Sequence, residues 1–183
     1  MNEDRPSSLW AESPQYRYPS PDMADGVVAS IHIADTPAGP TRSVSDILAV
    51  AGRGLEGDRY FAGIGSWSDR PGGGREVTLI ESEAIEALER DHGVSIDPGD
   101  ARRNIVTRGV ALNHLVGKGF VVGEVRLLGL RLCEPCGHLE KLTRRGVREG
   151  LVHRGGLRAE IVAGGTIRPG DPIRPDPEGA PPG

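Results

Sequence analysis

The chain has 183 residues and a formal net charge of -4 at pH 7, with 26% of its residues charged. This length is enough for one domain with a substantial core, and the negative net charge argues against nucleic acid as the main partner. Aromatic residues make up only 4% of the chain, whereas 27 residues are glycine and 15 are proline. Such a composition favours many short strands joined by turns over a helical bundle.

Membrane insertion and secretion find no support in the sequence. No apolar run is long enough to span a membrane, and the N-terminus does not combine a basic start with an apolar stretch. The chain has two cysteines, which are too few for a disulfide framework. These features lead us to expect a cytoplasmic protein with reduced cysteines and no membrane partner.

The first third of the chain contains one clear strand. Residues 1–25 are polar, contain several prolines and show no hydrophobic period, which predicts a flexible N-terminal tail. From Val27 to Ile33, apolar residues occupy the odd-numbered positions, as in a half-buried strand. Residues 44–50 are expected to pair back onto this strand, and residues 52–60 are too rich in glycine for a regular element.

The middle of the chain combines loops and strands with one helix. Residues 64–74 predict a loop and residues 76–80 a short strand. Ser82 is a candidate cap for a helix over about residues 83–92, and Gly93 is suited to end it. A narrow apolar edge places this helix on the surface of a sheet.

The remaining elements are mostly strands. Residues 104–107 predict a strand, residues 112–115 a single helical turn, and residues 139–144 a short helix. Residues 120–132 give the longest strand signal, and their apolar positions change parity in mid-run, which indicates a β-bulge or a bend.

Two final strands, over residues 157–162 and 166–173, precede a tail rich in proline and glycine. Many short strands with few helices predict a mainly β fold, either a barrel or a sandwich.

Both cysteines lie in the segment 133–137, directly after the longest strand signal. Pro135 fixes its own φ and holds the preceding residue extended, so that Cys136 stands on a stiff corner. The Cys-x-x-Cys spacing leaves open a redox pair, a zinc site completed by His138 and His153, and two buried structural thiols. We favour a single functional thiol at Cys136, because proline and glycine hold and expose it.

Several arginines lie beside glycines or in turns, namely Arg59, Arg75, Arg102, Arg103 and Arg154. In a chain of negative net charge, such arginines are candidates for binding an anion such as a phosphate. The alternative is that they are ordinary surface charges or partners for the 26 acidic residues. The glycine-rich segments 54–57 and 72–74 match neither a P-loop nor a dinucleotide-binding fingerprint.

Taken in order, several segments resemble the MOSC domain, the C-terminal module of molybdenum cofactor sulfurases. The matching segments are 52–60 (GRGLEGDRY), 76–80 (EVTLI), 102–105 (RRNI), 112–117 (LNHLVG), Pro135-Cys136, 154–159 (RGGLRA) and Gly170-Asp171. The resemblance implies a closed or nearly closed β-barrel with a few short flanking helices. It places this domain at residues 26–174, between flexible tails at residues 1–25 and 175–183.

The resemblance also implies a site and two candidate functions. Cys136 would be the catalytic cysteine and the ligand of molybdenum in a pterin cofactor, the molybdenum cofactor. Arg102 and Asn104 occupy the Arg-x-Asn positions of the family pattern, and three further arginines are candidates for binding the cofactor: Arg59, Arg75 and Arg154. Similar stand-alone members reduce N-hydroxylated compounds, including toxic base analogues, which implies a small-molecule substrate and a redox partner.

Other members of the family are regarded as sulfur carriers. This alternative implies that Cys136 accepts persulfide sulfur from a pyridoxal-phosphate-dependent cysteine desulfurase, for cofactor or metal–sulfur cluster assembly. A third possibility is a non-catalytic binding module that retains the barrel alone. Cys133 has no place in the family pattern, which leaves room for a persulfide-resolving or disulfide role.

Overall fold

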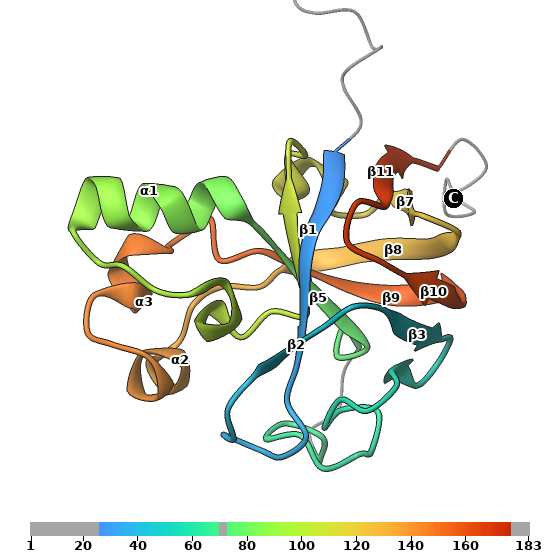
Figure 1. The fold of residues 1–183 in the computed structure, drawn as a ribbon, viewed down its shortest axis with the longest axis horizontal. Coiled ribbons are helices and arrows are strands. Elements are labelled where there is room, and N and C mark those ends of the chain that lie inside the picture. The colour runs from blue at the N-terminus through green and yellow to red at the C-terminus, as the bar shows by residue number, and fades with distance from the viewer. Residues whose placement is uncertain (1–25, 70–72, 177–183) are drawn as a thin grey trace, which may run out of the picture.

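The computed structural model describes residues 26–69 and 73–176, and within these ranges the chain is mainly β with three short α-helices (Figure 1). The strands are β1 (Gly26–Ile33), β2 (Arg42–Val44), β3 (Ile47–Val50), β4 (Gly54–Leu55), β5 (Val77–Glu81), β6 (Ile105–Arg108), β7 (Gly119–Val122), β8 (Val125–Leu132), β9 (Leu157–Ala163), β10 (Gly165–Ile167) and β11 (Pro172–Pro175). The helices are α1 (Ser82–His92), α2 (Gly137–Leu142) and α3 (Val147–Gly150), with 3-10 turns η1 (Pro98–Ala101) and η2 (Leu112–Leu115).

Seven strands form a closed barrel in the order β11-β7-β8-β9-β5-β6-β1. The barrel closes where β1 pairs with β11, with Gly26 opposite Ile173 and Val27 opposite Pro172. Every pair around the barrel is antiparallel except β5–β6, whose parallel strands require a crossover connection. The prediction of a mainly β barrel with a few short helices is confirmed.

Two apolar clusters stabilise this arrangement. The first fills the barrel and includes the fully buried Phe120 and Leu127. The second lies outside β5 and β6, where Leu88 of α1 and Val147 of α3 pack against Ile80. The helices therefore gather on one side of the barrel, as Figure 1 shows at the left. None of the helices in the described part of the chain could cross a membrane.

Several predicted elements are present, but the burial pattern of β1 and the start of α1 differ from the prediction. In β1, a register shift between Val28 and Ser30 buries Val28 and leaves Val27 36% exposed, so the predicted alternation fails at the start of the strand. Helix α1 begins at Ser82, whose hydroxyl donates to Glu83 instead of capping the helix. Gly93 ends α1 as predicted, with a φ of 65°.

Three strand predictions were wrong in their extent. Residues 120–132 form a hairpin, because Gly123 adopts a φ of 59° and turns β7 back onto β8. The predicted bulge is present in β8, between Gly129 and Arg131. Of residues 44–50, only Val44, the last residue of β2, pairs with β1, whereas β3 joins β4 and β10 in a second sheet.

The last strand signal, residues 166–173, divides into β10 and β11 around a turn in which the backbone N–H of Arg168 donates to Asp171. Strand β11 continues to Pro175, and Arg126 donates to the carboxylate of Asp176 at 2.9 Å. The described structure therefore extends past the predicted domain end at residue 174. The predicted N-terminal tail, residues 1–25, lies outside the described residues.

Gly156 precedes β9 and makes a close approach to the neighbouring strand β5. Its φ is 107°, and a Cβ placed there would lie 2.0 Å from the carbonyl oxygen of Leu79. We expect Gly156→Ala to lower the free energy of unfolding by at least about 2 kcal/mol more than Gly93→Ala, because only the former must displace backbone. Gly93 is the matched control, since its φ is also positive but a Cβ there would meet no atom within 4 Å. Urea denaturation measures both, and equal losses would contradict the prediction.

Candidate functional site

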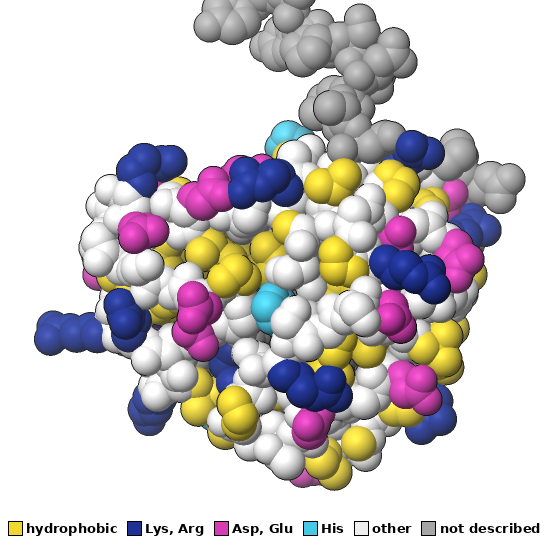
Figure 2. Space-filling view, viewed as in Figure 1, with side chains coloured by type: hydrophobic (Ala, Val, Ile, Leu, Met, Phe, Trp, Pro, Cys, Tyr) yellow, Lys and Arg dark blue, Asp and Glu magenta, His cyan; other side chains and the backbone are white. Residues whose placement is uncertain are grey.

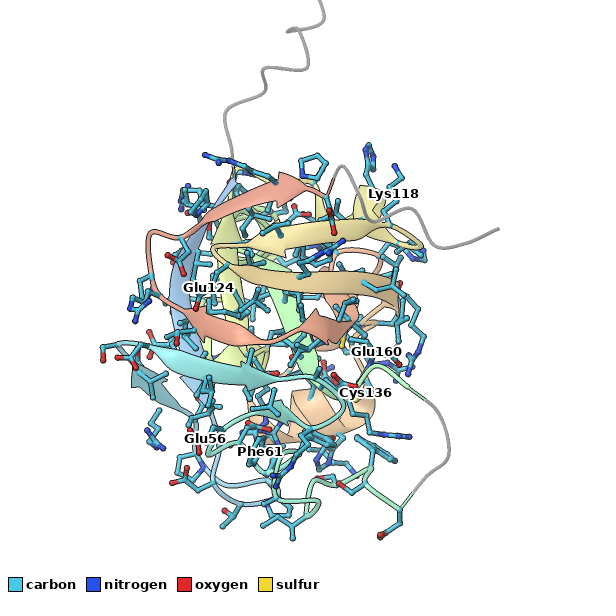
Figure 3. The ribbon with its side chains drawn as sticks, turned by 90° about the vertical axis from the view of Figure 1, so that its right-hand side faces the viewer. Glu56, Phe61, Lys118, Glu124, Cys136 and Glu160 are labelled. Carbon is cyan, nitrogen blue, oxygen red and sulfur yellow. The ribbon has the colours of Figure 1, made fainter. Side chains whose placement is uncertain are left out.

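An open cavity collects side chains from five separate parts of the chain. Its empty space, including the part open to solvent, is about 670 Å³. The lining residues are Arg59, Tyr60, Ser66, Trp67, Arg75, Thr78, Arg102, Arg103, Asn104, Cys133, Glu134, Cys136, His138, Leu139 and Arg158. In Figure 3, Cys136 lies near the middle of the view and Lys118 at its top.

The two cysteines differ in their accessibility. Cys136 is exposed and directly precedes α2, in an extended conformation with φ -135° and ψ 166°. Cys133 is only 2% exposed, and its backbone N–H donates to the carbonyl of Gly156 at 2.7 Å. Both thiols are free. The hypothesis of two buried structural thiols is therefore wrong for Cys136, and among the described residues no three His, Cys, Asp or Glu side chains gather to hold a metal ion.

Arg103 holds the cysteine corner against the rest of the barrel. Its side chain is 8% exposed and donates to three carbonyl oxygens: Cys133 at 2.9 Å, Gly155 at 2.8 Å and Ala101 at 3.2 Å. A buried guanidinium needs such partners because its unsatisfied N–H groups would be costly. The contacts join the end of β8 to the loops before β6 and β9.

Gly155 explains why the loop before β9 is rich in glycine. A Cβ at this position would lie 2.5 Å from the carbonyl oxygen of Cys133 and 2.9 Å from Cδ of Pro135. The loop packs directly against the backbone of the cysteine corner, which leaves no room for a side chain. Tight packing accounts for this glycine without a phosphate ligand.

The cavity concentrates positive charge. Five arginines line it, namely Arg59, Arg75, Arg102, Arg103 and Arg158, against one carboxylate, Glu134. Behind the lining, the buried carboxylate of Asp58 pairs with Arg59 at 3.1 Å, which still leaves an excess of arginines. Glu134 is engaged with His153, since its carboxylate accepts from the backbone N–H at 3.0 Å and lies 3.3 Å from Nδ1. In a chain with a net charge of -4, this local excess of arginine is the main electrostatic feature of the cavity.

Burial is the main cause of two pKa shifts in the cavity, and the charges of the arginines also act on both groups. Burial lowers the pKa of Arg102, and the positive charge of Arg59 lowers it further. Burial raises the pKa of Tyr60, while the surrounding arginines, chiefly Arg59 and Arg158, act in the opposite direction. Arg102 also has a φ of 56°, a left-handed conformation that is uncommon for a residue with a side chain. An anion in the cavity would relieve the repulsion between these guanidinium groups.

Arg158 carries a polar atom that the protein leaves unsatisfied. One terminal nitrogen, Nη1, donates to the carbonyl of Gly74 at 3.0 Å. Its Nε is buried, however, and has no hydrogen-bond partner. Buried donors without partners are rare and call for a reason. Since Arg158 lines the cavity, an anionic ligand is a fitting partner for Nε.

Asn104 has a supporting place in the site. Its Oδ1 accepts from the backbone N–H of Thr78 at 3.1 Å and from the Thr78 hydroxyl at 2.8 Å. Its Nδ2 donates to the carbonyl of His32 and to the buried carboxylate of Asp58. Asp58 in turn accepts from Arg59 at 3.1 Å. The Asn104 amide is thus engaged within the protein, and it holds the arginine-bearing segments together.

The structure brings together most of the predicted site residues. Cys136, Arg59, Arg75, Arg102 and Asn104 all line the cavity. Arg154 does not: its guanidinium lies 3.4 Å from the carboxylate of Asp91, on the outer surface near α1.

Sequence reasoning overlooked Arg158 and Trp67. In β9, Arg158 and Glu160 alternate with apolar residues, which predicts that Arg158 points away from the core, and Trp67 is one of two tryptophans in the chain. Trp67 packs edge-on against His138, with ring centroids 6.2 Å apart. His138 was considered only as a zinc ligand, and it lines the same cavity as Cys136. The pair gives the cavity an aromatic wall.

Comparisons with known proteins agree on the fold. The family model of the MOSC domain matches residues 54–174. No curated protein matches the chain. The solved YuaD protein from Bacillus subtilis is 18% identical, with a TM-score of 0.67 over 82% of this chain and 94% of that chain. YiiM from Geobacillus stearothermophilus is 15% identical, with a TM-score of 0.63 over 82% of this chain and 75% of that chain.

The network around Asn104 predicts a large effect on stability. We expect Asn104→Ala to lower the free energy of unfolding by about 2–4 kcal/mol, because the backbone N–H and hydroxyl of Thr78 and the carbonyl of His32 would each lose a hydrogen bond. Arg154→Ala is the control and should cost less than about 0.5 kcal/mol, since its ion pair is partly exposed. Chemical denaturation of both variants provides the measurement, and similar small losses would show that Asn104 does not support the site.

Proposed function

The chain belongs to the MOSC domain family, and on that premise we propose that it binds molybdenum cofactor through Cys136 and the cavity arginines and reduces N-hydroxylated compounds. The observation that carries this proposal is the combination of an exposed thiol and five arginines in one cavity with a single carboxylate. A soft thiolate suits molybdenum, and guanidinium groups suit the phosphate of a pterin cofactor. Free thiols also suit the reducing cytoplasm, where we place its activity.

The residues present fit such a cofactor. The buried Nε of Arg158 has no partner in the protein, and Arg59 and Arg102 add positive charge to the same cavity. These groups would hold the anionic part of the cofactor, and Cys136 would supply the thiolate ligand. When bound, the cofactor would supply two-electron redox chemistry.

The proposed reaction consumes two electrons and two protons. The N–O bond of R–NHOH breaks, the amine R–NH₂ forms, and the oxygen leaves as water. The electrons would come from a redox partner protein. The aromatic wall of Trp67 and His138 supports a flat substrate, such as an N-hydroxylated base, lying beside Cys136.

Cofactor content tests the proposal directly. Protein purified from a host that makes molybdenum cofactor should contain molybdenum and pterin in equal amounts, measured by elemental analysis and by fluorescence of the oxidised pterin. We expect the Cys136→Ser variant to contain at least about tenfold less molybdenum than the wild type, because a hydroxyl is a poor ligand for this metal. Arg158→Gln should lose pterin as well, because Nε would no longer meet the anion.

Arg154→Gln is the matched control for Arg158→Gln, because it removes the same charge outside the cavity. It should retain the cofactor content of the wild type. Wild-type protein without molybdenum or pterin, purified from such a host, would refute the proposed function.

The exposure of Cys136 also supports the alternative of a sulfur carrier. A sulfur carrier needs an accessible thiol that can meet the persulfide of a desulfurase, and Cys136 is exposed whereas Cys133 is buried. The desulfurase persulfide would pass its outer sulfur to the Cys136 thiolate, and the desulfurase thiolate would be the leaving group.

Mass spectrometry distinguishes this alternative. After incubation with a pyridoxal-phosphate-dependent cysteine desulfurase and cysteine, the wild-type chain should gain the mass of one sulfur atom on the peptide that contains Cys136. Cys136→Ser should gain none, and Cys133→Ser should still gain one because Cys133 is buried. An unchanged mass of the wild type would count against sulfur transfer.

A further inference from the structure

Arg131 and Arg158 lie directly opposite each other on the neighbouring antiparallel strands β8 and β9. Directly opposed residues of such a pair share a face of the sheet, and their Cβ atoms lie about 4.5–5.5 Å apart. Two like charges in this arrangement destabilise the pair unless a group of opposite charge lies between them. On the face of the molecule that Figure 2 draws, in contrast, many of the Lys and Arg side chains lie beside Asp or Glu.

A β-bulge brings Arg131 to this position. The register of β8 against β9 shifts just before Arg131, with Leu130 as the extra residue. Without the bulge, Arg131 would lie opposite Leu157, whose side chain is fully buried in the barrel. The bulge therefore moves a guanidinium group from the core side of the sheet to the outer side, next to Arg158.

The carboxylate on the same face of β9 does not neutralise the two arginines. Glu160 follows Arg158 by two residues and so shares its face. Its Oε1 would lie 2.4 Å from a Cβ placed at Gly73, so the carboxylate is directed at the loop before β5. No ion pair joins Glu160 to either arginine, and Arg131 forms none with any described residue.

The guanidinium groups of this pair keep N–H groups that a ligand can use. Nη1 of Arg158 donates to the carbonyl of Gly74 at 3.0 Å, which holds the side chain at that loop, whereas its buried Nε has no partner. Arg131 is exposed, so its side chain is free to turn toward a group bound at Nε. Since Arg158 lines the cavity that contains Cys136, a ligand held by both arginines would extend from the cavity onto the outer side of β8 and β9.

We propose that Arg131 and Arg158 form a two-arginine site for a phosphate monoester. A phosphate group has enough oxygen atoms to accept from two guanidinium groups at once, and it carries a charge of about -1.5 to -2 at pH 7 that balances them. A carboxylate has one negative charge and two oxygen atoms, which a single guanidinium group satisfies. This inference rests on the proposed function for the source of the phosphate, which is the pterin cofactor or a nucleotide that carries the N-hydroxylated base.

Titration with methyl phosphate, a small phosphate monoester, tests the site. The full-length chain is produced in a host that cannot make molybdenum cofactor, so that no cofactor competes with the probe. We expect Arg131→Gln to raise the Kd for methyl phosphate by at least about fivefold, measured by calorimetry. The matched control is Arg168→Gln, which removes the same charge from the exposed turn between β10 and β11 and should change the Kd by less than about twofold.

Thermal unfolding of the same samples separates ligand binding from a structural role of Arg131. Without phosphate, Arg131→Gln should have a Tm no lower than that of the wild type, because the substitution removes a repulsion between opposed charges. Methyl phosphate should raise the Tm of the wild type more than that of the variant. A lower Tm of the variant without phosphate would show that Arg131 stabilises the fold, which would overturn the proposal.

Three results of the titration would also overturn the proposal. The first is a wild-type chain that does not bind methyl phosphate. The second is an equal loss of affinity in Arg131→Gln and Arg168→Gln. The third is acetate binding as tightly as methyl phosphate, because the site would then not distinguish a phosphate from a carboxylate.

Pterin content identifies the source of the phosphate, in protein purified from a host that makes molybdenum cofactor. A lower content in Arg131→Gln than in Arg168→Gln assigns the phosphate to the cofactor. Equal contents, together with weaker binding of adenosine monophosphate to Arg131→Gln, assign it to a nucleotide, and both outcomes support the site.

The same samples keep this inference separate from the proposed function. A wild-type chain that binds methyl phosphate through Arg131 but contains neither molybdenum nor pterin would refute the proposed function and leave the phosphate site standing. A wild-type chain that contains molybdenum, with a Kd for methyl phosphate that Arg131→Gln does not change, would refute the phosphate site alone.

Discussion

The site depends on one buried cation. The guanidinium of Arg103 lies between the carbonyl oxygens of Ala101, Cys133 and Gly155, and it joins three segments that are far apart in the chain. Because its partners are carbonyl dipoles, they satisfy its N–H groups without cancelling its charge. Arg103 therefore positions the corner that carries Cys136 and also adds to the positive potential of the cavity.

A second polar network supports the other wall of the cavity. Asp58 accepts from Arg59 and Asn104, and Asn104 ties both to Thr78 in β5. Such buried networks are rigid when every member has a partner. The polar residues of this site therefore form two groups. Arg103, Asn104 and Asp58 hold the architecture, whereas Arg158 and Cys136 retain groups that the protein itself does not use.

The cavity arginines are partly buried, so the repulsion between their charges is screened less than it would be in solvent. Asp58 offsets part of this repulsion, since its carboxylate accepts from Arg59 at 3.1 Å. An anionic ligand between Arg59 and Arg102 would offset more of it.

The sequence by itself determined the local features. Glycines and alternating apolar residues were enough to predict strands, the end of α1 at Gly93 and the stiff corner at Cys136, because these depend on backbone conformation within a few residues. Only the tertiary structure decided which arginines share a cavity. Arg154 and Arg158 are four residues apart, yet one pairs with Asp91 outside and the other lines the site. Barrel closure and strand register bring distant residues together, and no local pattern encodes that contact.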